Sequence, residues 1–147
     1  MKPLLERWHR FLEGIRQGFV PPREELVQYI TEYPEQEIHL DNPRGSSKAF
    51  GRGKKNKVEL PFDYGEYPTL INPADNMGWD IIIVPSATKD DQFLIPVGHV
   101  EYSKDRRAKL GNDKIIIAPD GQYSDEDRKI IDDFFTDLEG FESVKWY

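Results

Sequence analysis

Short runs rich in β-branched residues constrain this chain more than any other feature. They occupy residues 81–84 (Ile-Ile-Ile-Val), 93–95 (Phe-Leu-Ile), 97–102 and 115–117 (Ile-Ile-Ile). Each run is bounded by Pro, Gly, Asp or Asn, which is typical of strands. Residues 144–147 form a further candidate strand at the end of the sequence. We therefore expect a β-sheet to dominate the part of the chain after residue 80.

Apolar residues at helical spacing occur at both ends of the sequence. Residues 4–15 predict an amphipathic first helix, and residues 23–33 predict a second, shorter one. Residues 124–138 predict a third helix, in which Ser124 and Asp127 have the spacing of a capping pair. Helices outside a sheet-rich segment indicate the α+β class.

Length and composition bound the organisation and the chemistry. A chain of 147 residues is long enough for one sizeable core, so we expect a single domain, residues 1–147, with residues 1–34 as a helical N-terminal extension. No apolar stretch approaches the roughly 20 residues that span a bilayer, and the first residues lack the apolar run of a signal peptide. We therefore expect a cytoplasmic protein that has no membrane partner.

The charged and sulfur-containing residues exclude several functional classes. With no cysteine, the chain has no disulfide, no thiol nucleophile and no cysteine-bound metal, so oxygen and imidazole are left as metal ligands. A net charge of -7 disfavours nonspecific binding of nucleic acid by the whole chain. The three histidines show no metal-ligand spacing, and we interpret them as bystanders.

Residues 42–57 form a glycine-rich cationic segment, which we predict to be a loop. Its six basic residues, with no acid among them, are Arg44, Lys48, Arg52, Lys54, Lys55 and Lys57. Such a segment is either a solvated surface loop or a cradle for phosphate oxygens, and its composition leaves both readings open. Arg44, Lys48 and Arg52 are the candidate phosphate ligands in this segment.

Carboxylates fall near the ends of the predicted strands. They are Asp75, Asp80, Asp105 and Asp113. If these ends converge, mutual repulsion favours a hard divalent cation between the acids. Opposite these acids, Lys114 is a candidate cation for phosphate and Tyr64 a candidate hydrogen-bond donor. A metal held by acids on one side and cations on the other describe a phosphoryl-transfer site. A turn at Asp75 and a surface ion pair at residues 113–114 explain part of the same pattern without any ligand.

Five strings follow one another between residues 60 and 139, within a segment of roughly residues 41–146. They are residues 60–67 (Leu-Pro-Phe-Asp-Tyr-Gly-Glu-Tyr), 75–81 (Asp-Asn-Met-Gly-Trp-Asp-Ile), 96–100 (Pro-Val-Gly-His-Val), 112–119 (Asn-Asp-Lys-Ile-Ile-Ile-Ala-Pro) and 134–139. In this order they resemble the tyrosine turn, the metal motif, the Pro-Val-Gly strand, the Asp-Asp-Lys strand and the C-terminal helix of family I soluble inorganic pyrophosphatases.

The resemblance implies a fold, a reaction and a set of site residues. The implied fold is a small OB-like barrel of mixed strands over residues 41–147, including a C-terminal helix, and the implied reaction is hydrolysis of inorganic diphosphate or a related phosphoanhydride with several Mg²⁺ ions. The family's tendency to assemble implies a homo-oligomer. The resemblance places Asp80, Tyr64 and Lys114 in catalysis. It places Lys48, Arg52, Tyr64 and Lys114 at the phosphate, where Arg44 is a further candidate from its charge alone. The implied metal ligands are Asp75, Asp80, Asp105 and Asp113. Asp41 is similar in place to a glutamate of the family's Glu-x-Pro-x-Gly-Ser motif.

The chain departs from the family pattern at several of these positions. Met77 stands where the metal motif has its middle aspartate, and Asn112 replaces the first aspartate of the Asp-Asp-Lys string. A thioether is a poor ligand for Mg²⁺, so fewer metals and a lower rate are expected. The alternative is an impaired relative that binds phosphate, a nucleotide or a nucleic-acid end through the basic loop, or acts as an assembly subunit.

Overall fold

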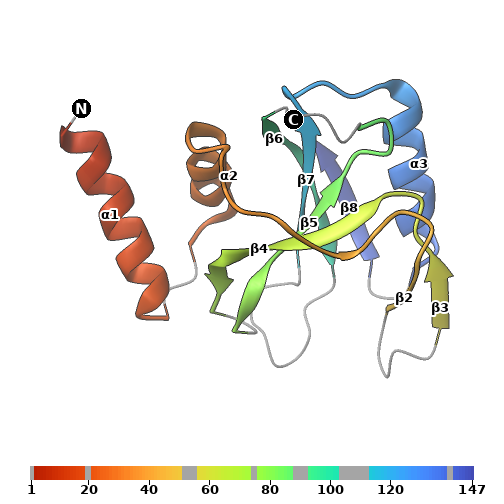
Figure 1. The fold of residues 1–147 in the computed structure, drawn as a ribbon, viewed down its shortest axis with the longest axis horizontal. Coiled ribbons are helices and arrows are strands. Elements are labelled where there is room, and N and C mark those ends of the chain that lie inside the picture. Colours follow the sequence, from red (N-terminus) through yellow and green to blue (C-terminus); the bar gives the residue numbers. More distant parts are fainter. Residues whose placement is uncertain are drawn as a thin grey trace.

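The isoleucine-rich runs lie at the centre of a six-stranded sheet. The computed structural model describes residues 2–18, 21–50, 56–73, 76–87, 93–102, 113–138 and 141–147 of the chain. Figure 1 shows the sheet, whose strands in spatial order are β1 (His39–Asn42), β4 (Asp63–Asn72), β5 (Met77–Ile83), β7 (Lys114–Pro119), β6 (Leu94–Tyr102) and β8 (Phe141–Trp146). The predicted strands at 81–84, 115–117 and 144–147 are thus confirmed as parts of β5, β7 and β8, whereas the two runs at 93–95 and 97–102 form one strand, β6.

The two innermost strands, β5 and β7, run parallel, and every other neighbouring pair in the sheet is antiparallel. Ile81, Ile82 and Ile83 of β5 lie opposite the three isoleucines of β7, residues 115–117. All six are buried, the most exposed being Ile83 at 9%. Since successive side chains of a strand point to opposite faces, a continuous apolar run of this kind requires cover on both faces.

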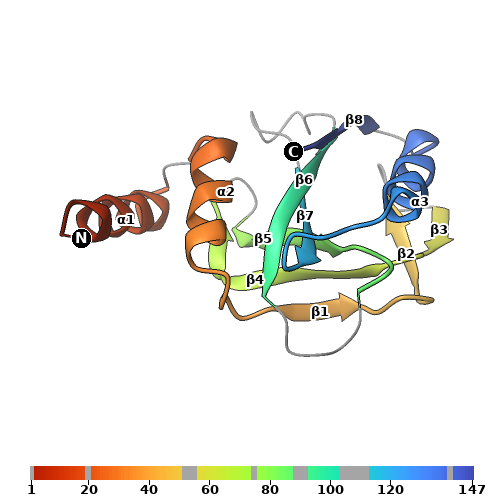
Figure 2. The same cartoon turned by 90° about the horizontal axis from the view of Figure 1, so that it is seen from above.

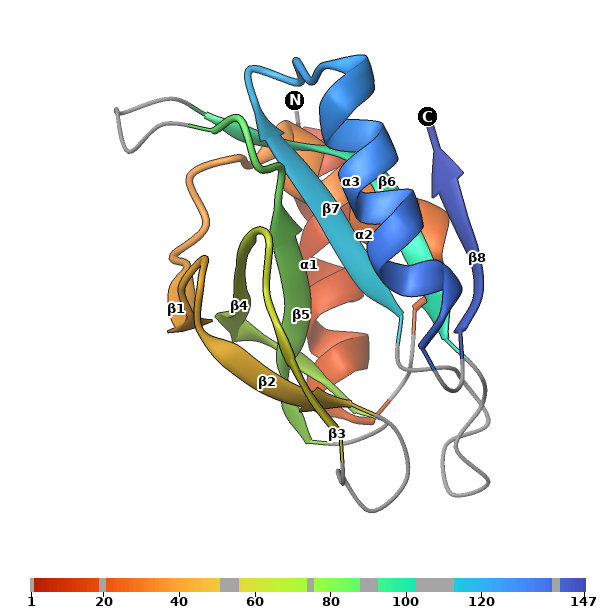
Figure 3. The same cartoon turned by 90° about the vertical axis from the view of Figure 1, so that its right-hand side faces the viewer.

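The helices supply that cover. Ile81 and Ile83 pack into one apolar cluster with side chains of α1 (Lys2–Arg16) and α2 (Arg23–Glu32), whereas Ile82 packs into a second cluster with α3 (Asp125–Thr136). Figure 3 shows α3 in front of the sheet and the other two helices behind it. The sheet is therefore the middle layer between two helical layers.

The three predicted helices are confirmed to within about two residues at each end. The Ser124 side chain caps α3 by accepting from the Asp127 backbone N–H, and the Asp127 carboxylate accepts from the Ser124 backbone N–H. These two bonds form the predicted capping pair. Helix α1 lies outermost, next to α2 (Figure 2), and contacts it through Trp8 and Phe11, whose rings lie 5.4 and 5.3 Å from that of Tyr29. Of the helices in the described ranges, none is both long and apolar enough to cross a lipid bilayer.

Two expectations about the sheet need correction. The mixed sheet with its helices agrees with an α+β fold, but the sheet is open in the described residues, with β1 and β8 at its edges, so the expected barrel is not confirmed. The cationic segment is also more regular than the predicted loop, because β2 (Ser47–Phe50) and β3 (Asn56–Glu59) pair as an antiparallel hairpin. The hairpin strands pair with one another, so they form a separate small sheet and do not close the large one.

The pairing of β1 with β4 depends on a glycine. Gly65 lies opposite Leu40, and a Cβ built on Gly65 would stand 2.2 Å from the backbone oxygen of His39. Real Cβ atoms do not approach a carbonyl this closely, so β1 can lie against β4 only because residue 65 has no side chain.

Gly65→Ala should therefore loosen β1 in particular. We expect the added methyl group to cost about 1–3 kcal/mol of unfolding free energy, as overpacking does. Native-state hydrogen exchange should show the largest loss of protection in the amides of residues 39–42. As a control, Gly18→Ala adds a methyl group with no heavy atom within 4 Å, at a φ of +90°, and should leave β1 protected. Unchanged protection of β1 in Gly65→Ala would contradict this account.

Candidate functional site

A row of polar side chains crosses the sheet where the apolar core ends. His39 of β1 lies opposite Glu66 of β4, and Glu66 lies opposite Asp80 of β5. Asp80 and Lys114 each precede the paired isoleucines of β5 and β7 by one residue, and the Lys114 ammonium donates to Asp80 Oδ2 at 3.2 Å. By strand alternation these side chains share the face of Ile82 and Ile116, which is the face that α3 covers further along.

Tyr64 is where the two candidate phosphate lysines meet. The Lys48 Nζ lies 4.6 Å from the centre of the Tyr64 ring and the Lys114 Nζ 5.2 Å from it, both within the range of a cation–π contact. Lys48 comes from the β2–β3 hairpin, so the hairpin brings a second positive charge to the Lys114 end of the sheet. The structure thus assembles Lys48, Tyr64, Asp80 and Lys114, four of the predicted site residues; we call this group the lysine–tyrosine site.

Burial dominates the electrostatics of Lys114. The residue is only 3% exposed. Loss of hydration lowers the pKa of its ammonium, the attraction of Asp80 works in the opposite direction, and the charge of Lys48 adds to the lowering. A buried ammonium beside a second cation is stabilised by any anion that reaches it. The site therefore suits a ligand with several negative oxygens.

Asp113 lies away from this group. Arg23 of α2 donates from Nε to Asp113 Oδ2 at 3.0 Å, and its terminal nitrogen contacts the same oxygen. Arg23 also approaches Glu101 Oε1 at 3.4 Å. The structure therefore joins Asp113 to the α2 face of the sheet and does not bring it to Asp80.

Glu101 extends this network to a buried histidine. His99 Nε2 lies 3.0 Å from Glu101 Oε1, and His99 Nδ1 lies 2.8 Å from the hydroxyl oxygen of Tyr147. Burial lowers the pKa of His99, and the hydrogen bond from His99 is the main cause that lowers the pKa of Glu101. The network links α2 to β6, the start of β7 and the end of the chain, and it gives both ring nitrogens of the buried His99 a partner.

The other predicted site residues divide into two groups. The Arg44 side chain donates to the Pro85 carbonyl at 3.0 Å, and the Arg44 backbone N–H donates to Asp63 Oδ1 at 2.7 Å, so Arg44 ties the start of the hairpin to neighbouring loops. Arg52, Asp75 and Asp105 lie outside the described residues.

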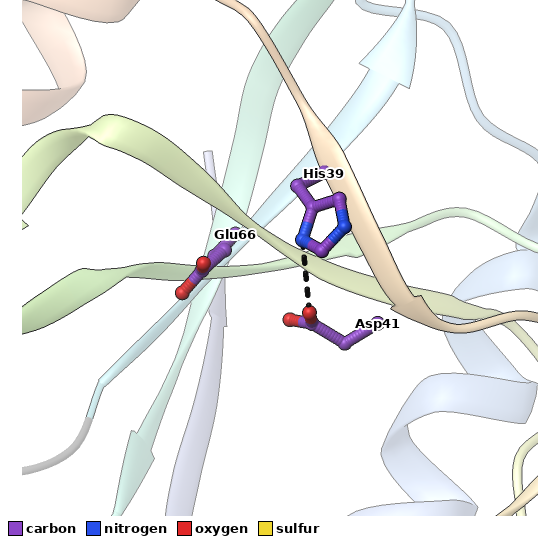
Figure 4. A group of neighbouring side chains, drawn as sticks. All are labelled: His39, Asp41 and Glu66. Carbon is purple, nitrogen blue, oxygen red and sulfur yellow. Dashed lines mark ion pairs between the residues drawn. The ribbon is translucent and has the colours of Figure 1, made fainter.

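Sequence reasoning missed one group of potential ligands. One side-chain ligand atom from each of His39, Asp41 and Glu66 lies within 4.8 Å of the other two (Figure 4). His39 and Asp41 are two residues apart, a spacing that places two side chains on one face of a strand and that could have flagged the pair. Glu66 is distant in sequence, and only the register of β1 against β4 reveals it.

Comparison with known proteins leaves the family open. No family model matches the chain, and no curated protein does. A solved structure of an inorganic pyrophosphatase from Neisseria gonorrhoeae is similar to the chain with a TM-score of 0.49 and 17% sequence identity, over 74% of this chain and 80% of that chain. A likeness of this strength does not establish a shared fold, so the resemblance in motifs remains a prediction.

The ion pair between Asp80 and Lys114 should be strongly coupled. Asp80→Asn removes the carboxylate nearest a buried ammonium, and because Asp80 itself is 23% exposed we expect a loss of up to about 3 kcal/mol. The double variant with Lys114→Met should lose much less than the sum of the two single losses, since neither charge is then left alone. Urea unfolding measures all four corners of the cycle. Additive losses would refute the coupling, and Glu6→Gln, in an exposed ion pair of α1, serves as the control.

Stability should fall in mildly acidic solution because of His99. Its pKa in the folded state lies below the ordinary 6.5, so the unfolded chain takes up the proton first. Its contribution is fully present above about pH 6.5 and decreases as the pH falls below that value. We expect the unfolding free energy of His99→Gln to change less between about pH 7.5 and about pH 5.5 than that of the unsubstituted chain. Exposed His9, replaced by Asn, is the control; an equal pH dependence in all three proteins would contradict the assignment.

Proposed function

We propose that this chain is an enzyme that hydrolyses inorganic diphosphate, or a closely related small phosphoanhydride, with Mg²⁺ at the lysine–tyrosine site. The observation that carries the proposal is the convergence of the Lys48 and Lys114 ammonium groups on the Tyr64 ring beside the Asp80 carboxylate. Transfer of a phosphoryl group needs positive charge around the phosphate oxygens and an oxygen ligand for a metal ion. These four side chains offer both.

The residues fit a hard divalent ion. Asp80 Oδ2 accepts from Lys114, and no residue that the structure describes donates a hydrogen bond to Oδ1 of the same carboxylate, which could therefore bind a metal. Mg²⁺ characteristically takes one or two carboxylates and completes its shell with water and substrate phosphate, so it does not need a cage of protein ligands. Asp80 would hold it, with Asp75 and Asp105 as further proposed ligands. The bound ion would offset negative charge on the phosphate oxygens.

The chain's own residues have distinct tasks in this proposal. Lys114 is buried and held by Asp80, so its ammonium is fixed in place and serves as the anchor for one phosphoryl group. Binding of a phosphate anion favours the charged form of Lys114 and so opposes the effect of burial on its pKa. Lys48 lies on the hairpin, with its ammonium 4.6 Å from the centre of the Tyr64 ring, and would neutralise further charge on the phosphate oxygens.

A second candidate function is phosphate binding without turnover. Asp113, one of the four acids expected at the metal, is engaged by Arg23, and Asp80 is already paired with Lys114. Met77, in the place of an expected acid, is 61% exposed and supplies no oxygen. The shortage of carboxylates at the metal favours phosphate binding over fast hydrolysis. The two candidates differ in whether phosphate is released from diphosphate.

Phosphate release from inorganic diphosphate, measured with and without Mg²⁺, tests the proposal. We expect Mg²⁺-dependent release that falls by at least about 100-fold in Lys48→Met, since loss of one charge-stabilising donor commonly costs 10²–10³ in rate. Lys57→Met is the matched control, because Lys57 is an exposed lysine of the same hairpin. Asp80→Asn should abolish the dependence on Mg²⁺.

The outcomes separate the two candidates. Absence of Mg²⁺-dependent release by the unsubstituted chain would overturn the enzyme. If diphosphate then still raised the melting temperature, and Lys48→Met removed that effect, the binding candidate would remain. Equal release by Lys48→Met and Lys57→Met would show that activity lies outside the lysine–tyrosine site.

A further inference from the structure

His39, Asp41 and Glu66 form a compact group of metal-ligating side chains at the outer edge of the sheet. The His39 Nδ1 lies 3.1 Å from Asp41 Oδ1, and a Glu66 oxygen lies within 4.8 Å of both ligand atoms. Figure 4 shows the imidazole and the Asp41 carboxylate facing each other from β1, with Glu66 beside them on β4. We call these three residues the edge triad.

The backbone of β1 is irregular at the middle member. Leu40 lies opposite Gly65 and Asn42 lies opposite Tyr64, so Asp41 between them has no partner residue on β4. This is the pattern of a β-bulge, which inserts one unpaired residue and re-aims its side chain. Bulges cost regular pairing and are common beside functional sites. At this bulge the extra residue is a carboxylate turned toward an imidazole.

The third member, Glu66, occupies space that a glycine leaves open. Glu66 stands over Gly78 of β5, and a Cβ built on Gly78 would lie 2.8 Å from Glu66 Oε2 and 2.7 Å from the Tyr67 carbonyl oxygen. Residue 78 must therefore lack a side chain for Glu66 to occupy this position. The carboxylate is only partly exposed, whereas the side chains of His39 and Asp41 are 66% and 40% exposed. The three ligands thus leave an open side toward solvent.

We infer that the edge triad binds one divalent first-row transition metal ion, such as Zn²⁺ or Co²⁺, with water completing its coordination. An imidazole nitrogen with two carboxylates is a donor set that suits these ions, whereas Mg²⁺ prefers oxygen alone. Zn²⁺ bonds to imidazole nitrogen and carboxylate oxygen at about 2.0–2.2 Å, so one shared ion requires its ligand atoms to lie within a few ångströms of one another. The three ligand atoms of the edge triad, all within 4.8 Å of one another, are already close to that separation. The site shares no residue with the lysine–tyrosine site and does not depend on the proposed function.

The competing explanation is an ordinary surface ion pair between His39 and Asp41. Such a pair needs neither Glu66 nor a metal, and it gives little stability in water. The two explanations differ in a measurable way, because a shared ion couples all three side chains and a surface pair couples only two.

Isothermal titration of the full chain with Zn²⁺, without an affinity tag and in a buffer that does not chelate, tests the inference. We expect one ion per chain at the edge triad, apart from any ion that Asp80 binds, and a weakening of this binding by at least about tenfold in both His39→Asn and Glu66→Gln, because even an outer-shell partner of a metal ligand commonly contributes that much. Co²⁺ should give visible absorption bands that His39→Asn alters. Thermal unfolding without metal checks that each variant is folded.

Two matched controls exclude general effects of charge. His9→Asn removes an exposed histidine of α1, and Asp133→Asn removes an exposed carboxylate of α3; both should bind Zn²⁺ as the unsubstituted chain does. No saturable binding below about 1 mM would overturn the inference, and so would equal affinity in His9→Asn and His39→Asn. Zn²⁺ binding that depends on His39 and Glu66 would support the site even if the chain releases no phosphate from diphosphate.

Discussion

The parallel pairing of β5 with β7 is the interaction on which the rest of the structure depends. Three isoleucines on each strand lie opposite one another, and their side chains alternate between the two faces of the sheet. A polar face is impossible at this centre, so α1 and α2 must cover one side and α3 the other. The same register sets Asp80 beside Lys114, because each residue immediately precedes its apolar run.

That register also explains why a costly charge can be buried. A lysine at 3% exposure loses nearly all its hydration, and the carboxylate of Asp80 compensates for part of the loss. The remaining positive charge faces Tyr64 and a second lysine, Lys48. The core thus fixes an ammonium group in a place where it would stabilise a bound anion. This follows from the packing of the sheet, and it holds whether or not the site turns a substrate over.

Sequence reasoning reached the elements more readily than their assembly. Periodicity located the helices, and the Ser124 and Asp127 spacing located the cap of α3, because both signals are local. Strand pairing was harder to predict. The local hairpin of β2 and β3 has few apolar residues to mark it, and the closure of the sheet depends on which edge strands, distant in sequence, lie side by side. Of the site, Tyr64, Asp80 and Lys114 follow from motifs, whereas Glu66 beside His39 follows only from strand register.

Asp113 shows how alternation limits inference from a motif. Asp113 and Lys114 are neighbours in sequence, which suggests that they serve one site, but consecutive side chains at a strand point to opposite faces. Lys114 therefore joins Asp80 on one side, while Asp113 joins Arg23 and α2 on the other. Of these two neighbours, Lys114 thus belongs to the lysine–tyrosine site, whereas Asp113 binds α2 of the N-terminal helical layer to the sheet. The two contacts are made by adjacent residues at the point where β7 begins.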